Sequence, residues 1–150
     1  RCHRVTGVQT CALPICVQVS EPEVLLRVPG DRQYALAIRT ALGGVAILKD
    51  LDADTLDDLR MAADEMCDCL LHQGRTVDHL EVAVYDEGDY LKVAISACYG
   101  EKKCPCEDET EITRAVLQTL ASDVEMTRCG DCVQCITLLL HKATAPLKKQ

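Results

Sequence analysis

The 150-residue sequence predicts an α+β fold, a two-layer sandwich in which helices cover one face of a mostly antiparallel sheet. Three observations predict it. Segments typical of strands and helices follow one another in the order β, α, α, β, β, α, β, β. Two short polar turns, at 86–89 and 129–132, each join two apolar segments, as hairpin turns do. One long segment has apolar residues at helical spacing.

The first three predicted elements are a strand and two helices. Residues 23–28 are rich in Val and Leu and predict a strand, which Pro29 ends. Asp31 can cap a helix whose apolar residues are Ala35, Ile38, Leu42, Val45 and Leu48. Asp52 can cap a second helix, which Gly74 would stop. Its apolar residues lie three and four apart: Leu56, Leu59, Ala63, Met66 and Leu70.

The remaining segments predict two strands, a polar loop, a helix and a closing hairpin. In chain order they are 80–85, 90–95, 100–109, 110–121, 124–128 and 133–140. The loop contains nothing to bury, so we expect it to be mobile. The helix has Ile112, Val116 and Leu120 on one side.

The two ends of the chain are expected to lie outside the domain. Residues 5–15 are VTGVQTCALPI, the translation of a common sequencing adapter. We therefore treat residues 1–16 as an artefact rather than a secretory signal, since they contain no continuous apolar stretch of signal-peptide length. Residues 17–143 are expected to form one domain, and residues 144–150 a flexible tail.

The composition is acidic and rich in cysteine. A formal net charge of −8 disfavours binding to nucleic acid or to an anionic membrane surface, and it suits a basic partner. No segment approaches the roughly 20 apolar residues that span a bilayer. Of the 11 cysteines, three lie in residues 1–16; with no export signal, the other eight predict reduced thiols or metal ligands in a cytoplasmic protein.

The element order and residues 59–72, LRMAADEMCDCLLH, resemble the bacterial anti-sigma factor serine kinases. These kinases belong to the ATPase superfamily shared with histidine kinases and Hsp90-type chaperones. The family helix carries Glu, three residues, Asn, two apolar residues and a nearby His. Glu65 and the apolar pair fit, and His72 lies one place early. The resemblance implies a histidine-kinase-like ATPase fold, a role in transcription regulation, a sigma factor or anti-anti-sigma partner, and a homodimer.

The resemblance also assigns roles within this helix. In the family, the Glu activates the attacking hydroxyl, so Glu65 is the candidate catalytic residue; the alternative is a solvated helix carboxylate. The Asn holds the magnesium that bridges the phosphates, and Cys69 takes its place here. A thiol is a poor ligand for Mg²⁺, which prefers oxygen donors. Asp68 could supply oxygen, but it lies about 100° round the helix from Glu65 and Cys69.

The two other nucleotide-binding segments of the family are largely missing. In place of Asp-x-Gly-x-Gly, residues 95–101 are ISACYGE, so Gly100 remains and the carboxylate that binds adenine does not. In place of a Gly-rich loop, residues 104–110 are CPCEDET, and an acidic loop repels phosphates. We therefore expect an ATP and magnesium site that is degraded, with Cys69 and Gly100 at two of its positions.

The cysteines suggest a second kind of site. Cys129 and Cys132 flank a tight turn that could direct both sulfurs at one zinc ion, and Cys104 and Cys106 could complete a tetrahedral site. The alternatives are simple packing, which suits Cys135 in its strand, and a redox pair.

Three functions therefore remain open, beside a fourth, purely structural reading as a soluble α/β domain whose partner the sequence does not name. The chain could be an anti-sigma-type regulator that binds a sigma factor or an anti-anti-sigma partner with little catalysis. Alternatively, it could be an active serine/threonine kinase of an anti-anti-sigma protein, with Glu65 as base. As a third reading, it could be a zinc-stabilised or redox-responsive domain on the same scaffold.

Overall fold

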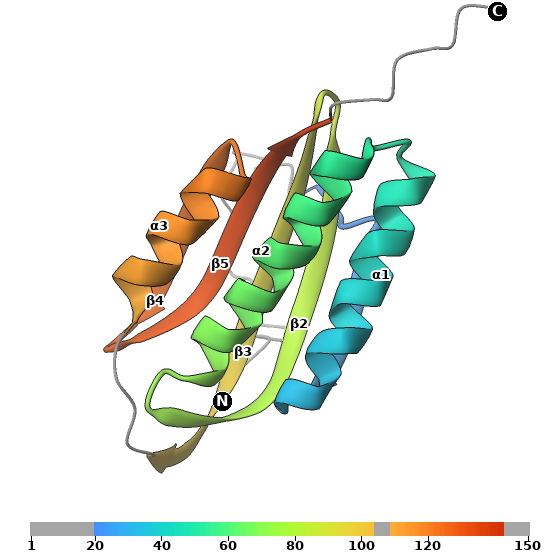
Figure 1. Ribbon diagram of the computed structural model, residues 1–150. Coiled ribbons are helices and arrows are strands. Elements are labelled where there is room, and N and C mark those ends of the chain that lie inside the picture. Colours follow the sequence, from blue (N-terminus) through green and yellow to red (C-terminus); the bar gives the residue numbers. More distant parts are fainter. Residues whose placement is uncertain (1–19, 104–108, 143–150) are drawn as a thin grey trace, which may run out of the picture.

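A computed structural model describes residues 20–103 and 109–142, which form three α-helices, a 3₁₀ turn and one five-stranded sheet (Figure 1). Segment 1–16, the tail 144–150, Cys104 and Cys106 lie outside the described residues. The elements in chain order are β1 Val24–Pro29, the 3₁₀ turn Arg32–Tyr34, α1 Ala35–Leu48, α2 Ala53–Leu71, β2 Arg75–Glu87, β3 Tyr90–Lys103, α3 Thr110–Leu120, β4 Asp123–Cys129 and β5 Cys132–His141.

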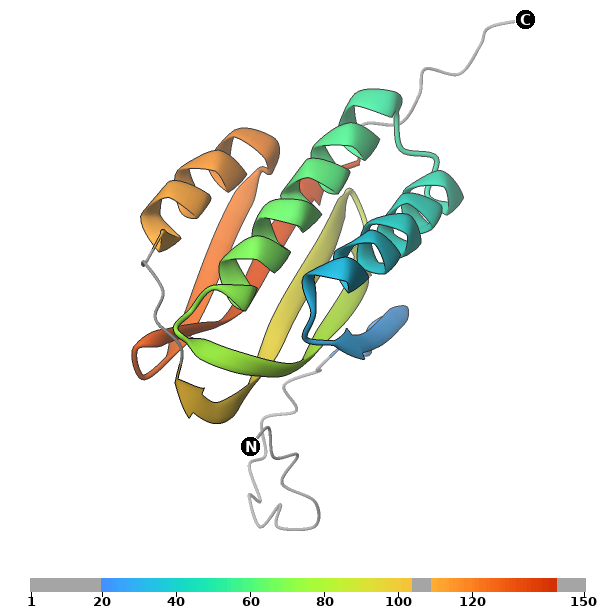
Figure 2. The same ribbon diagram turned by 60° about the horizontal axis from the view of Figure 1, so that its bottom comes forward.

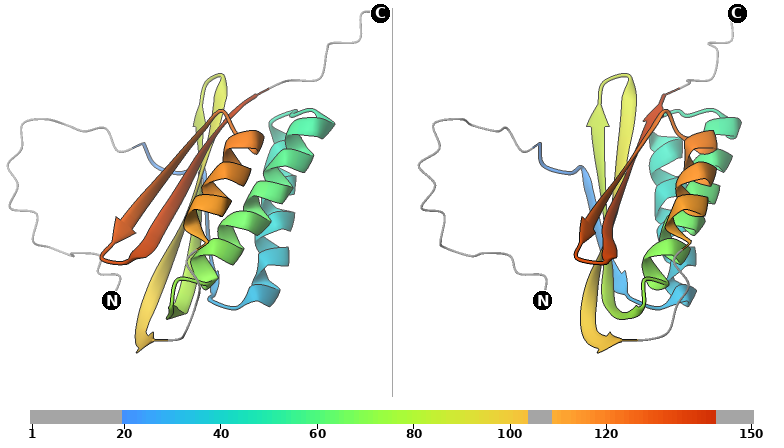
Figure 3. Two further views of the ribbon diagram at one scale, coloured as in Figure 1. Left: turned by 60° about the vertical axis from the view of Figure 1, so that its left-hand side comes forward. Right: turned by 90° about the vertical axis from the view of Figure 1, so that its left-hand side faces the viewer.

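The sheet has the order β1-β2-β3-β5-β4, and every neighbouring pair is antiparallel. The chain leaves the sheet after β3, forms α3, and returns at the far edge as β4. β5 then pairs with both β4 and β3, so β1 and β4 are the edges. All three helices lie on the same side of the sheet, and α2 lies between α1 and α3 (Figures 2 and 3). The predicted α+β two-layer sandwich is confirmed.

The core lies between this sheet and the helices. Along α2, the predicted apolar residues Leu59, Ala63, Met66 and Leu70 are all buried. The central strand β3 alternates, and its side chains Leu91, Val93, Ile95 and Ala97 face them. Burial of an apolar side chain contributes roughly 1.5–3 kcal/mol. This stripe is therefore what fixes α2 across the middle of the sheet.

The start of α2 is set by the predicted cap. The Asp52 carboxylate accepts a hydrogen bond from the Thr55 backbone N–H at 2.8 Å. Hydrogen bonds from Thr55 also hold the pKa of Asp52 below its usual range. At the other end, Gly74 has a φ of 76°, a left-handed conformation that favours glycine and turns the chain from α2 into β2. No described helix combines the length and the apolar character that crossing a bilayer requires.

Three details of the structure differ from what the sequence indicates. Leu48, the last residue of α1, is 81% exposed rather than packed against the sheet. In α3, the buried side is formed by Thr113 and Leu117, which face α2, and Ile112 is 65% exposed. The predicted polar loop begins later than expected, because β3 continues to Lys103 by pairing with the first residues of β2.

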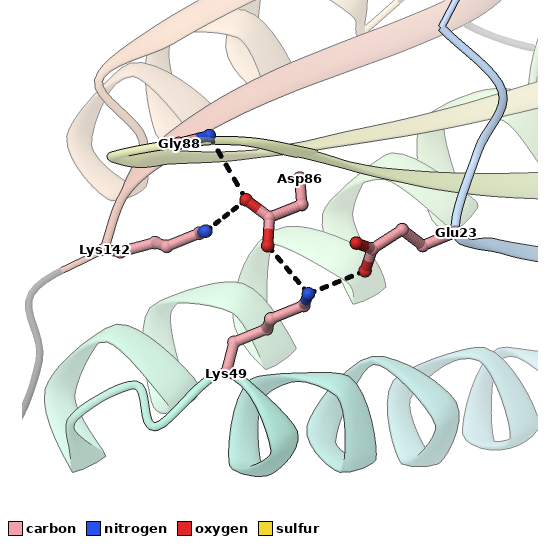
Figure 4. Close-up of polar contacts among 5 residues, drawn as sticks. All are labelled: Glu23, Lys49, Asp86, Gly88 and Lys142. Atoms are coloured by element: carbon pink, nitrogen blue, oxygen red, sulfur yellow. Dashed lines mark hydrogen bonds and ion pairs between the residues drawn. The ribbon is translucent and has the colours of Figure 1, made fainter.

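An ion-pair cluster joins several elements near the start of α2 (Figure 4). Lys49, at the end of α1, contacts both Glu23 and Asp86 at 2.7 Å. Asp86 lies near the end of β2, and it also pairs with Lys142, just after β5. Hydrogen bonds from Lys142 and Lys49 lower the pKa of Asp86 to about 2. Hydrogen bonds from Asp86 and Glu23 raise the pKa of Lys49.

Candidate functional site

A cavity of about 410 Å³ lies between the second half of α2 and the start of α3. Its lining residues are Glu65, Asp68, Cys69, His72, Gln73, Glu109 and Thr113. Two residues that the sequence singled out, Glu65 and Cys69, are therefore brought together in one wall. Residues three and four apart share a helix face, which explains why α2 contributes so many of these side chains.

The cavity wall is rich in negative charge. Glu65 and Asp68 come from α2, and Glu109 is the N-cap residue of α3, with no side-chain capping hydrogen bond. No Lys or Arg lines the cavity among the residues that the structure describes. Arg32 approaches one of these carboxylates: its Nε lies 3.6 Å from Asp68 Oδ1, and its side chain is 74% exposed. This arrangement favours cations and disfavours phosphates.

Asp64, which precedes Glu65 in α2, makes an ion pair with a residue of α1. Asp64 accepts a hydrogen bond from Arg39 of α1 at 3.1 Å, so it is paired on the side of α2 that faces α1. Asp68, which the sequence offered as a substitute magnesium ligand, lies in the cavity wall instead. His72 ends α2, and its Nδ1 lies 2.6 Å from the Asp68 carbonyl oxygen.

Hydrogen bonds between neutral groups hold the C-terminal end of α2, beside the cavity, to the sheet. Gln73 Nε2 donates to the Cys69 carbonyl at 2.9 Å, and Gln73 Oε1 accepts from the Val133 N–H at 2.9 Å. The Tyr99 hydroxyl lies within hydrogen-bond distance of the carbonyls of Leu70 and Val133. Burial raises the pKa of Tyr99, so this hydroxyl stays protonated and can donate. Together, Gln73 and Tyr99 fix the end of α2 to β3 and β5.

Gly100 is not among the residues that line the cavity. It lies in β3, where a Cβ atom would come within 2.7 Å of Thr76 Oγ1 in the neighbouring strand β2. Close approach of the two strands therefore accounts for a glycine here.

The two cysteines of the predicted zinc turn lie on either side of the β4–β5 hairpin. Cys129 and Cys132 are cross-strand partners, and Cys129 is exposed. Cys132 is buried, and its thiol donates to the Gln73 carbonyl at 3.1 Å. Their proposed partners Cys104 and Cys106 lie outside the described residues, so zinc binding stays a prediction.

Other cysteines are suited to packing rather than to chemistry. Cys67 is fully buried, and burial raises its pKa to about 12. Burial also raises the pKa of Cys135. Within the described ranges, one group of three potential metal ligands converges, formed by Asp78, His79 and Cys98. Cys98 is in a disulfide bond and offers no free thiolate, so the expectation of reduced thiols is wrong at this residue.

Sequence reasoning missed Gln73, Glu109 and Thr113. Gln73 directly follows a helix end, where any polar residue is common. Glu109 and Thr113 lie at the start of α3, on a side that the apolar pattern of this helix did not mark as facing inward. No sequence signal marked them, because they meet α2 only through the packing of α3 on it.

Comparisons with known proteins were made for sequence and for fold. No protein-family model matches the chain. Two curated relatives, the anti-sigma-F factors RsbW of Mycobacterium tuberculosis strains CDC 1551 and H37Rv, are 30% identical to it over 105 residues. The match covers 68% of this chain and 60% of each relative, so the chain spans less than two thirds of their length.

A crystal structure of the RsbU and RsbW domains of a Mycobacterium tuberculosis protein has a similar fold. It matches with a TM-score of 0.58 over 80% of this chain and 33% of that chain. The sequence identity is 15%, so this similarity concerns the fold alone.

Proposed function

The chain belongs to the anti-sigma regulatory factor family with the histidine-kinase-like ATPase fold, and from this premise we propose that it regulates transcription by binding protein partners. The partner is a sigma factor or an anti-anti-sigma protein. Both curated relatives carry the name anti-sigma-F factor. Action in the cytoplasm and a homodimer belong to the same proposal.

The charge of the cavity supports binding without phosphoryl transfer. The cavity lies beside Glu65 and Cys69, the two positions at which the resemblance places the attacking-group base and the magnesium ligand. Three carboxylates line it, and no Lys or Arg of the described chain does. Phosphoryl transfer depends on positioning the phosphates and neutralising their charge. A site of this composition would repel a triphosphate, and Cys69 is a poor substitute for an oxygen ligand of Mg²⁺.

An active kinase remains the second candidate, because Glu65 does line a cavity. This candidate requires Asp68 to hold the magnesium in place of Cys69, and an adenine contact from a residue not identified by sequence. A third candidate, a zinc-stabilised or redox-responsive domain, requires thiolates from the segment outside the described residues.

Binding is tested directly by mixing the purified chain with purified sigma factors and anti-anti-sigma proteins of its source, with and without MgATP. We expect a stable complex on size-exclusion chromatography in the absence of nucleotide. A chain that forms no complex with any of these partners would refute the proposal. The elution volume of the chain alone tests the homodimer.

Nucleotide binding separates the regulator from the kinase. We expect millimolar MgATP to leave the melting temperature unchanged, whereas a ligand at 100 times its dissociation constant adds about 2.7 kcal/mol to stability. Transfer of labelled phosphate to an anti-anti-sigma protein, abolished by Glu65→Gln, would instead establish the kinase. Metal analysis of protein purified without chelator tests the zinc candidate.

A further inference from the structure

We propose that Asp78, His79 and Cys98 form a zinc-binding site in the chain whose Cys98 disulfide bond has been reduced. The three residues lie in β2 and β3, and none of them lines the cavity between α2 and α3. The inference goes beyond the proposed function and does not depend on it. All three ligands are described residues, unlike those of the zinc site predicted around Cys129 and Cys132.

Strand pairing brings His79 and Cys98 together on one face of the sheet. They are cross-strand partners in the ladder between β2 and β3. The next pair, Leu80 and Ala97, is buried under the helices. Side chains alternate between the two faces along a strand, so His79 and Cys98 point to the opposite face. No helix of the described chain covers that face (Figure 3).

A β-bulge adds Asp78 to this pair. The register of β2 against β3 shifts between Val77 and His79, which leaves Asp78 without a cross-strand partner in β3. A bulge interrupts the alternation of side chains and can re-aim one of them. Asp78 Oδ2 lies 3.0 Å from His79 Nδ1, and the ligand atoms of all three residues lie within 4.8 Å of one another. The pairing and the bulge therefore gather three different ligand types at one point.

The ligand types select zinc. A thiolate, an imidazole and a carboxylate are all zinc ligands, whereas Mg²⁺ and Ca²⁺ prefer oxygen donors alone. One thiolate and one carboxylate also balance the charge of a divalent ion. Ligand atoms around tetrahedral zinc are about 3.3–3.8 Å apart, so small side-chain rotations close the observed separation. Cys98 is 8% exposed and the Asp78 side chain 75% exposed, so one side of the ion is open to a water as fourth ligand.

The disulfide bond of Cys98 controls this site. A metal ligand must be a thiolate, and in the structure the Cys98 sulfur is bonded to another sulfur. Two molecules of a thiol reductant break this bond. They supply two electrons and two protons, two cysteine S–H groups form, and the reductant becomes a disulfide. The Cys98 thiol then releases its proton to solvent as zinc binds. Zinc binding therefore belongs to the reduced chain.

The test measures metal binding to the whole chain in its reduced and oxidised forms. Both forms carry Cys129→Ser/Cys132→Ser, which removes the other predicted zinc site. A phosphine reduces the chain, so that no added thiol competes for the metal. Co²⁺ is the probe, because its charge-transfer absorption reports a bound thiolate, and Zn²⁺ is then added. We expect thiolate-bound Co²⁺ in the reduced chain, displacement of Co²⁺ by Zn²⁺, and no such absorption in the oxidised chain.

Two ligand substitutions are compared with two matched controls. Cys98→Ser and His79→Gln should each weaken Co²⁺ and Zn²⁺ binding by roughly tenfold or more. Cys135→Ser and His141→Gln change the same residue types in β5, outside the cluster, and should change binding by less than about twofold. Circular dichroism of the metal-free variants checks their fold. His79→Gln leaves every thiol in place, so it carries the test even where Cys98→Ser does not fold.

Four results would each overturn the inference. They are equal metal binding by the oxidised chain, binding that survives His79→Gln, equal loss in either control variant, and loss of all thiolate-bound Co²⁺ in Cys129→Ser/Cys132→Ser. The last result would assign the metal to the β4–β5 hairpin. Partner binding is measured separately. A chain that binds a partner but no zinc here refutes this inference alone, and one that binds zinc here but no partner refutes the proposed function alone.

Discussion

Carboxylates near the two ends of α2 differ in whether a cation of the described chain is paired with them. Before α2 begins, Asp86 is held by Lys49 and Lys142 in a closed ion-pair cluster (Figure 4). Beyond its middle, Glu65 and Glu109 face a cavity without a cation from the described chain. The first arrangement satisfies its own charges and joins four segments of the chain, which contain Glu23, Lys49, Asp86 and Lys142. The second leaves charge available, and the end of the helix is held by neutral hydrogen bonds from Gln73 and Tyr99 instead.

This difference separates carboxylates that are ion-paired within the fold from carboxylates that are not. If the cavity end were stabilised by ion pairs, its carboxylates would be occupied and the cavity would be neutral. Neutral hydrogen bonds hold α2 in place while its charges stay unpaired. The predictions below test this division, beginning with the change that should cost the most stability.

Tyr99→Phe removes the hydroxyl that meets the carbonyls of Leu70 and Val133. We expect the free energy of unfolding to fall by about 1–3 kcal/mol, because buried acceptors lose their donor. Urea unfolding measures this. The control Tyr90→Phe, at a half-exposed ring at the other end of β3, should change stability by less than about 0.5 kcal/mol. Equal effects of the two substitutions would contradict a special role for Tyr99.

Cys132→Ala removes a buried thiol that donates to the Gln73 carbonyl. We expect a loss of about 1 kcal/mol from packing and the hydrogen bond. Cys129→Ala, its exposed cross-strand partner, should cost less than about 0.5 kcal/mol. A bound zinc ion would instead make both substitutions costly, and each would lower the zinc content. The pair of variants therefore separates a structural role at the cavity end from a metal site.

Asp86→Asn should cost less than either buried change, since the cluster is partly exposed and water screens its charges. Its effect should depend on pH. The pKa of Asp86 is about 2 in the folded chain, against an ordinary value of 3.8. A lowered pKa stabilises the fold above the ordinary value, and this contribution is lost as the pH falls from about 4 to 2.

The melting temperatures of wild type and Asp86→Asn should therefore differ at pH 7 and converge towards pH 2. Asp89→Asn, in the same turn without a lysine partner among the described residues, should show no such convergence. High salt should reduce the Asp86 effect and leave the Tyr99 effect unchanged. A difference that is constant with pH would contradict the cluster.

The sequence allowed the fold to be predicted where periodicity was strong. The stripe from Leu59 to Leu70 and the cap at Asp52 predicted α2 correctly, because local spacing and capping decide them. α3 was harder: Thr113 and Leu117 face α2, and only tertiary packing selects that side. The extension of β3 to Lys103 was missed for a similar reason, because its backbone groups are satisfied by a partner strand and not by its own composition.

The site was predictable only in part. Glu65 and Cys69 were identified through a resemblance along one helix, and the cavity does contain both. Glu109 could not be found, because it is remote in sequence and meets α2 only when α3 docks. The loss of phosphate-binding residues stays a prediction from the sequence, whereas the unpaired carboxylates in the cavity wall could not be predicted from it. Whether a carboxylate is unpaired depends on whether folding brings a cationic side chain next to it.

The two edge strands have a bearing on how copies of this chain avoid fibrillisation. β1 ends in Pro29, which lacks a backbone donor, and it carries Arg27; β4 carries Asp123 and Glu125 along a short, exposed run. An edge strand without such features is a template on which strands of other chains can pair and grow into cross-β fibrils. Two β4 edges brought together would place the Asp123 and Glu125 carboxylates of both copies near one another, and like charges across strands disfavour pairing.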